Sequence, residues 1–261
     1  MINKLNTNEL NNMFKNGNPF KHVIIDNFLN EKIAIKISNE FPLFDSDKWR
    51  KYNNQIEVKK LTNHYDNFGL HTYNLFHELN ASNFIDQLKN IVNLELIPDY
   101  GLNGGGLHIH KKGGKLNTHL DYSVHPKLDL ERRINLILYL TPDWNEKWNG
   151  GLGLWEGDKI RPNKLIKTIT PKFNRAVIFD TSENSWHGLP EPLKCPDNIF
   201  RKSLAVYYLT KKRVNISERG KALFSPYGDQ ENDKDVLELI KMRSQTNTAS
   251  AFYEKKIEPK E

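Results

Sequence analysis

Three residues in this sequence could together bind a metal ion: His119 and Asp121, which lie two positions apart, and His187 farther along the chain. In an extended strand, successive side chains point to opposite faces, so His119 and Asp121 would project from the same side. Two imidazoles and one carboxylate leave other coordination positions open, a ligand set typical of non-haem iron sites that also binds zinc. The sequence therefore predicts a metal site at these residues.

The positions of these residues strengthen a pattern that is weak by itself. A strand can carry a histidine and a carboxylate for ordinary hydrogen bonding. Here the pair lies on an expected strand, and His187 lies on another that follows the apolar run Ala176-Val177-Ile178-Phe179. A rolled β-sheet can return two such strands to the same end of the fold, so we expect the three side chains to meet.

Arg201 is a second candidate, because it opens an otherwise apolar stretch. An arginine is costly to bury without an anionic partner, and its planar guanidinium fits a carboxylate with two hydrogen bonds. Ser203, two residues on, faces the same way. Together they indicate a socket for the distal carboxylate of a dicarboxylate such as 2-oxoglutarate. The alternative is a structural salt bridge to a neighbouring acidic side chain.

Composition favours one globular domain over the 261 residues, since 38% of them are hydrophobic and 11% aromatic. The net charge is +6, but the basic residues are scattered among 32 acidic ones, so we expect no nucleic-acid partner. The single cysteine, Cys195, allows no intrachain disulfide, and we see no signal peptide and no apolar run long enough to cross a membrane. We therefore expect a cytoplasmic protein without membrane contact; the sequence indicates no oligomeric state.

Residues 1–97 are expected to form a region of strand and helices that packs on the core. Their patterns predict a short helix from Thr7 to Phe14, a strand from His22 to Asp26, a helix capped by Asn30, a strand near residues 55–60 and a helix capped by Ser82.

Residues 98–210 change to short strands separated by turn residues, which favours a rolled sheet. We expect a mainly β fold with flanking helices (α+β), whose core is a jelly-roll, cupin-like double-stranded β-helix. Residues 211–261 are expected to add a helical extension, with a helix near residues 235–242. The eight expected strands are Gly106 to Lys111, Leu116 to Tyr122, Arg133 to Leu140, Gly151 to Glu156, Leu165 to Thr170, Ala176 to Thr181, Ser185 to Leu189 and Lys202 to Thr210.

Several ordered motifs make the sequence resemble the Fe(II)/2-oxoglutarate-dependent dioxygenases, and within them the prolyl 4-hydroxylase-like branch. The resemblance covers roughly residues 107–209. Its motifs are His119-Leu120-Asp121, residues 139–144, residues 150–152, residues 171–175, His187 and Arg201. The strand and helix within residues 23–41 also look like the N-terminal part of such proteins.

The resemblance implies a role for each matching position. His119, Asp121 and His187 would bind Fe(II), Arg201 would pair with the distal carboxylate of 2-oxoglutarate, and Tyr139 and Ser203 would assist there. Tyr139 could as well be a core residue of its apolar strand. The implied reaction consumes O₂ and 2-oxoglutarate, releases succinate and CO₂, and hydroxylates a prolyl or other amino-acid substrate, free or in a peptide.

The sequence also departs from the family pattern. Prolyl hydroxylases carry tyrosines shortly before the His-x-Asp motif, where the alignment places Ile109 and Leu116. This leaves a sugar or nucleotide metabolite open as the substrate. The presence of Asp121 disfavours a halogenase. A non-catalytic β-sandwich that binds a small ligand is a further alternative, and a zinc hydrolase would leave Arg201 without a task.

The remaining polar residues near these motifs have several interpretations. His108 and His110 share one face of a strand, and His125 follows the metal motif. For all three, a histidine at the surface or in a hydrogen bond is a simpler interpretation than a histidine that binds a ligand. Arg132 and Arg133 precede the Tyr139 strand and could meet an anionic substrate.

Overall fold

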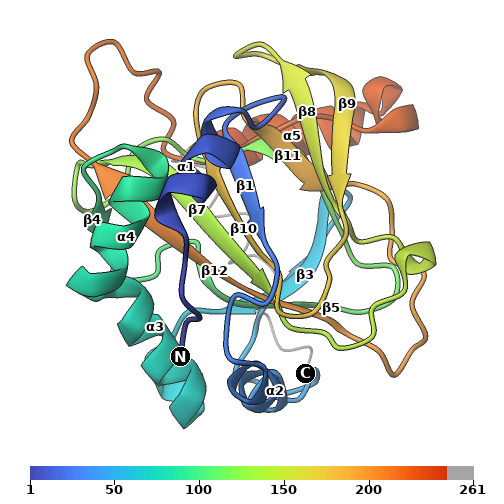
Figure 1. Cartoon of the computed structure of the whole chain (residues 1–261). Helices are drawn as coiled ribbons and strands as arrows, with labels where there is room; N and C mark the ends of the chain where they lie inside the picture. The colour runs from blue at the N-terminus through green and yellow to red at the C-terminus, as the bar shows by residue number, and fades with distance from the viewer. Residues whose placement is uncertain (246–261) are drawn as a thin grey trace.

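A curled antiparallel sheet forms the centre of the molecule in the computed structural model, which describes residues 1–245 (Figure 1). The helices are α1 (Thr7–Lys15), α2 (Glu31–Asn39), α3 (Leu70–Asn80), α4 (Ser82–Val92) and α5 (Lys234–Ser244). The strands are β1 (His22–Ile25), β2 (Arg50–Asn53), β3 (Glu57–Thr62), β4 (Ile97–Pro98), β5 (Gly106–His110), β6 (Lys115–Leu120), β7 (Glu131–Tyr139), β8 (Leu152–Gly157), β9 (Pro162–Ile169), β10 (Ala176–Asp180), β11 (Trp186–Leu189), β12 (Arg201–Thr210) and β13 (Leu223–Phe224).

The order of the strands explains the curl. It runs β1-β10-β7-β12-β5-β3-β6-β11-β8-β9, and β3 pairs with both β5 and β6. The strand β3 thus joins two sheets. The larger one consists of β1, β10, β7, β12 and β5, and the smaller one consists of β6, β11, β8 and β9. Two sheets rolled together in this way form the double-stranded β-helix that the sequence predicts, and all eight expected strands are present as β5 to β12.

Alternation along the strands of the larger sheet gives it two different faces. On β7 and β12, one set of alternate residues packs in the main hydrophobic core together with α1, α3 and α4, which lie side by side in Figure 1. That set comprises Ile134, Leu136, Leu138, Leu204, Val206 and Tyr208. The intervening residues include Asn135, Arg201 and Ser203, which face the inside of the roll. The same strands therefore supply a core on one face and polar groups on the other.

The first 97 residues enter the sheet as well as packing on it. β1 pairs with β10, and the hairpin of β2 and β3 extends the larger sheet. Asn30 caps α2 as expected, with its side chain accepting a hydrogen bond from the Lys32 N–H at 3.1 Å. The cap predicted at Ser82 is wrong, because Ala81 precedes α4 and Ser82 is already its first helical residue.

The sequence patterns did not indicate α3. Leu70 and Tyr73 on this helix are exposed, so its apolar periodicity is weak. Its first turn is capped from another element: the Glu40 carboxylate accepts hydrogen bonds from the N–H groups of His71 at 2.9 Å and Thr72 at 2.7 Å. A cap supplied by a distant residue leaves no local signature in the sequence.

The C-terminal part contains α5, as expected, and α5 packs with β13 in a small apolar cluster. The end of the expected helical extension, residues 246–261, lies outside the described residues. Within residues 1–245, none of the helices combines the length and apolar character that crossing a membrane requires.

Asn174 ties the N-terminal region to the sheet. It is buried in the turn between β9 and β10, with a left-handed backbone (φ 60°). Its side-chain oxygen accepts from the Leu29 N–H at 2.9 Å, and its amide donates to the Leu29 carbonyl at 2.7 Å. Its own N–H donates to the carbonyl of Tyr139 at 2.8 Å. One side chain therefore satisfies both backbone groups of a buried residue far away in sequence.

Asn174→Ala should lower the free energy of unfolding by about 2–4 kcal/mol, because the buried Leu29 N–H loses its partner, the Leu29 carbonyl keeps only its hydrogen bond from Asn3, and alanine disfavours a left-handed backbone. Urea unfolding followed by circular dichroism measures this change. Asn215→Ala is the matched control, since Asn215 has a similar backbone (φ 64°) but is exposed, and should cost about 1 kcal/mol or less. Equal losses in the two variants would contradict the role given to the Asn174 side chain.

Candidate active site

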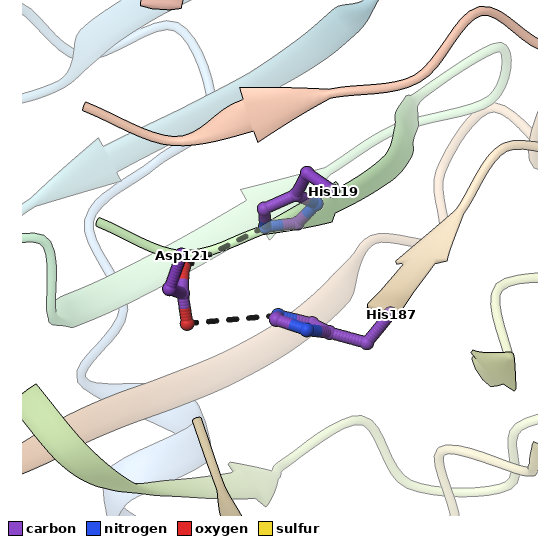
Figure 2. Close-up of side chains that lie close together, drawn as sticks. All are labelled: His119, Asp121 and His187. Atoms are coloured by element: carbon purple, nitrogen blue, oxygen red, sulfur yellow. Dashed lines mark ion pairs between the residues drawn. The ribbon is translucent and has the colours of Figure 1, made fainter. Parts of the chain in front are cut away.

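The structure brings His119, Asp121 and His187 together. His119 near the end of β6 lies directly opposite His187 on the neighbouring strand β11. The Nε2 atoms of the two histidines lie 3.7 Å from the two carboxylate oxygens of Asp121, one each, and all three ligand atoms fit within 4.8 Å of one another (Figure 2). Asp121 lies one residue beyond the end of β6, so its approach depends on the turn of the chain there as well as on strand alternation.

The backbone holds both imidazole rings in one orientation. Nδ1 of His119 lies 2.9 Å from the carbonyl oxygen of Asn117, and Nδ1 of His187 lies 2.9 Å from that of Ser185. A carbonyl can only accept, so Nδ1 of each neutral ring carries the hydrogen and donates. This leaves the lone pair on Nε2, the atom that faces Asp121, which is the arrangement that metal-binding histidines require.

The electrostatic surroundings favour the protonation states of metal ligands. Burial alone would raise the pKa of Asp121, but Arg132 and the two histidines outweigh burial and hold that pKa well below its ordinary value. Burial, together with the neighbouring His119, lowers the pKa of His187 to about 4. At neutral pH, Asp121 is therefore an anion and His187 is neutral.

Two phenylalanines pack against the histidine rings. Phe224 stacks on His119, with ring centroids 5.1 Å apart, and Phe179 contacts His187 edge to face at 4.8 Å. Phe224 belongs to β13, which pairs with β6 along the backbone of His119. This contact was not predicted, because its local signal in the sequence is no more than the apolar pair Leu223-Phe224 in a polar segment.

Arg201 is buried without a carboxylate partner. It is 3% exposed, and its Nε donates to the carbonyl of Gly150 at 2.8 Å. Among residues 1–245, no acidic side chain forms an ion pair with it, so the salt-bridge alternative is wrong for the described chain. Burial lowers the pKa of Arg201, as expected for a cation that lacks an anion. The guanidinium group is therefore available to an anionic ligand.

Tyr139 and Ser203 lie beside Arg201. They face each other across the pairing of β7 and β12, and the Tyr139 ring centroid is 5.0 Å from the Arg201 guanidinium carbon. The Tyr139 hydroxyl is buried with its oxygen near the Arg201 guanidinium, and its hydrogen has no acceptor within the described residues. Its ring packs in an apolar cluster with Leu152 and Phe179. Tyr139 is therefore a core residue whose hydroxyl is still free to donate a hydrogen bond. Burial raises the pKa of Tyr139, which keeps the hydroxyl protonated.

One cavity of about 800 Å³ holds both groups of residues, since the three clustered side chains line it together with Arg201 and Ser203. A metal ion and a dicarboxylate fit this lining chemically: two imidazole nitrogens and a carboxylate for the ion, and a buried guanidinium with neighbouring hydroxyls for the anion. The unsatisfied Tyr139 hydroxyl and the uncompensated Arg201 charge are the structural observations behind this fit.

The other polar candidates separate into distinct environments. Arg133 pairs with Asp180 at 2.9 Å, so it serves the structure and not the cavity. Nδ1 of His125 accepts from the N–H groups of Lys127 and Leu128, as the simpler interpretation expects.

The environments of His110 and Arg132 differ from what the sequence indicates. His110 was expected at the surface or in a hydrogen bond, but it is 3% exposed and neither of its ring nitrogens has a partner among the described residues. Arg132 is buried between the rings of Tyr122 and Tyr207 and lines the cavity.

Comparison with known proteins gives matches of three kinds. A family model described as the 2OG-Fe(II) oxygenase superfamily matches residues 105–209. The curated protein "Prolyl 3-hydroxylase OGFOD1" of Mus musculus is 38% identical over 63 residues, which are 24% of this chain and 12% of that protein. The matched part of the chain thus spans about an eighth of the length of this relative.

Two solved structures share the fold. A prolyl hydroxylase from Trichoplax adhaerens, in complex with a peptide fragment of hypoxia inducible factor, is 20% identical with a TM-score of 0.55, covering 78% of this chain and 90% of that one. A prolyl-4-hydroxylase from Pseudomonas putida is 14% identical with a TM-score of 0.56, covering 78% and 100%. These likenesses confirm the double-stranded β-helix.

Asp121→Ala should raise the dissociation constant for Mn(II) by at least about 100-fold, because it removes the anionic member of the cluster and leaves only the two imidazoles. Isothermal titration calorimetry measures this effect. His125→Ala is the control, since His125 lines the same cavity outside the cluster and should leave the Mn(II) affinity within about threefold of the original. Comparable losses in both variants would place the metal elsewhere.

Proposed function

We propose that the protein is an Fe(II)- and 2-oxoglutarate-dependent dioxygenase that hydroxylates a C–H bond, because residues 105–209 match the family model of the 2OG-Fe(II) oxygenase superfamily. The observation that carries this proposal is the buried Arg201, which has no acidic partner among residues 1–245 and lines the same cavity as the His-Asp-His cluster. A metal ion alone would give Arg201 no binding partner. A dicarboxylate that also binds the metal would give the guanidinium group an anion to pair with.

In this proposal, His119 and His187 hold Fe(II) through Nε2, and Asp121 holds it through its carboxylate. Three observations support these roles. The carboxylate is ionised because the pKa of Asp121 is lowered, both Nδ1 atoms are committed to backbone carbonyls, and the aromatic rings of Phe179 and Phe224 restrain the imidazoles. The protein thus meets the metal with its ligands already oriented, which reduces the cost of binding.

Arg201 takes the distal carboxylate of 2-oxoglutarate in this proposal, with hydrogen bonds from the Tyr139 and Ser203 hydroxyls. When bound, Fe(II), 2-oxoglutarate and O₂ supply the oxidising chemistry, and succinate and CO₂ are the by-products. The chain itself binds, orients and excludes water. Arg201 fixes one end of the cosubstrate, its Nε bond to the Gly150 carbonyl fixes the guanidinium plane, and the buried surroundings keep the carboxylate contact strong.

A prolyl residue in a peptide is the substrate that we propose first, because the curated relative is named as a prolyl 3-hydroxylase. Free proline, another amino acid, and a sugar or nucleotide metabolite are the alternatives. The absence of tyrosine at Ile109 does not argue against proline, since Ile109 packs in the main hydrophobic core. Its neighbours His108 and His110 line the cavity instead.

The other two alternatives have less support. A non-catalytic binding module does not require a metal cluster and an uncompensated arginine in one cavity, and a zinc hydrolase gives Arg201 no task. For location we propose the cytoplasm, supported by the single, buried and free Cys195, because proteins of oxidising compartments commonly use disulfides.

The proposed function is tested by incubating the protein with Fe(II), 2-oxoglutarate and a library of proline-containing peptides. Mass spectrometry should find succinate and a peptide that has gained one oxygen atom, both dependent on 2-oxoglutarate and both lost in His187→Ala. A folded, iron-loaded protein that neither binds nor consumes 2-oxoglutarate would contradict the proposal.

Arg201→Gln should weaken 2-oxoglutarate binding to the Mn(II)-loaded protein by about 100-fold, because a charge-assisted hydrogen-bond pair contributes roughly 3 kcal/mol. Calorimetry with 2-oxoglutarate measures the loss. Arg161→Gln, which removes an exposed arginine from the turn before β9, is the control and should bind normally. Unchanged 2-oxoglutarate affinity in Arg201→Gln would remove the main support for this cosubstrate.

A further inference from the structure

The cavity extends beyond the cluster along a wall formed by β5, β3 and β2. The register of β12 against β5 places His110 beside Arg201, and the register of β3 against β5 brings Lys59 next to His110. The register of β2 against β3 then places Tyr52 opposite Lys59. All four side chains line the cavity. A row of polar groups therefore leads from Arg201 to the outer edge of the larger sheet.

The two histidines of this wall have unused hydrogen-bonding atoms. Neither ring nitrogen of His110, and not the Nε2 of His108, has a partner within the described residues, although these atoms are buried. Burial lowers the pKa of His108 to about 3 and that of His110 well below its ordinary value, so both rings are neutral at neutral pH. The neutral His110 ring offers one N–H donor, whereas the N–H of His108 is directed at the backbone of Gly105 and leaves a lone pair on Nε2. Buried polar atoms without partners are rare, which points to a ligand here.

Positive charge accumulates along the same wall. Within residues 1–245, the cations Arg50 and Lys59 of this wall and the nearby Lys221 and Arg243 line the cavity around the carboxylate of Glu57. Asp129 and Glu218 also line the cavity, but both pair with Lys212. Glu57 accepts from Nε of Arg243 at 3.1 Å and lies 3.4 Å from Nζ of Lys59. Burial and the charges of Arg243 and Arg50 lower the pKa of Lys221, so the cations repel one another. One carboxylate does not balance this charge.

An anion is the ligand that satisfies both observations. Carboxylate and phosphate oxygens accept hydrogen bonds from neutral imidazoles, and they pair with lysine and arginine. A second metal ion does not fit, because Lys59 and Arg201 flank the histidines. Within the described residues, the side chains with metal-ligand spacing are the cluster of His119, Asp121 and His187.

We propose that this wall binds an anionic group of the substrate, a carboxylate or a phosphate. His110 and Lys59 contact the group directly, and Arg50 and Lys221 attract it at the outer end. The inference rests on the proposed function, because it assigns Arg201 to the carboxylate of the cosubstrate and leaves the wall to the substrate. In a peptide, an acidic or phosphorylated residue close to the target residue supplies the anion.

Four peptides of equal length test this proposal, each with one central proline flanked by glutamate, phosphoserine, glutamine or lysine. Their affinities for the protein loaded with Mn(II) and 2-oxoglutarate are measured by fluorescence anisotropy at low salt. The glutamate or phosphoserine peptide should bind at least about five- to tenfold more tightly than the glutamine peptide, and the lysine peptide more weakly. The tighter of the two anionic peptides identifies carboxylate or phosphate as the group.

Lys221→Glu should abolish this preference for anionic peptides, and His110→Phe should weaken binding of the preferred peptide while the glutamine peptide is less affected. Lys164→Glu changes the net charge equally on β9, outside the cavity, and should keep the preference. Equal affinity of the wild-type protein for all four peptides, or an equal effect of Lys164→Glu, overturns the proposal. A prior titration of wild-type protein with Mn(II) and 2-oxoglutarate shows separately whether the proposed function itself fails.

Discussion

The rest of the site depends on one constraint: a guanidinium charge buried in a low-dielectric interior needs an anion. The Nε of Arg201 is satisfied by the Gly150 carbonyl, but no acidic side chain of the described chain balances its charge. In the proposed function, a dicarboxylate that also binds the metal supplies this anion, and the cost of burying Arg201 is met during folding and not during binding. The position of Arg201 relative to the cluster of His119, Asp121 and His187 then determines which anions fit.

The rolled sheet makes this arrangement possible because its strands have two faces. The outward residues of β7 and β12 pack against the helices in the main core, and this burial stabilises strands whose inward residues are polar. The inward residues include Asn135, Arg201 and Ser203, which line the cavity on the larger sheet. The smaller sheet presents His119 and His187 on adjacent strands opposite them. The residues proposed to bind the metal and those proposed to bind the cosubstrate thus come from different walls of one roll.

Local patterns were sufficient to predict β5 to β12 and the three clustered residues, because strand alternation and turn residues are short-range signals. They could not reveal α3, whose first turn is capped by Glu40 from another element, or β13, which is only two residues long. The surroundings of His110 were also hidden, since its neighbours come from the pairing of β5 with β12 and β3. That no acidic side chain of the described residues pairs with Arg201 is a property of the fold and has no local signature.

The most direct test of the central claim is a crystal structure of the protein grown with Mn(II) and 2-oxoglutarate, with the metal located by its anomalous scattering. We predict one strong anomalous peak between Nε2 of His119, Nε2 of His187 and the carboxylate of Asp121. The 2-oxoglutarate should join this metal at its 2-oxo acid end and meet Arg201 with its distal carboxylate. A metal bound elsewhere, such as at His108 and His110, or a cosubstrate that does not contact Arg201, would contradict the account.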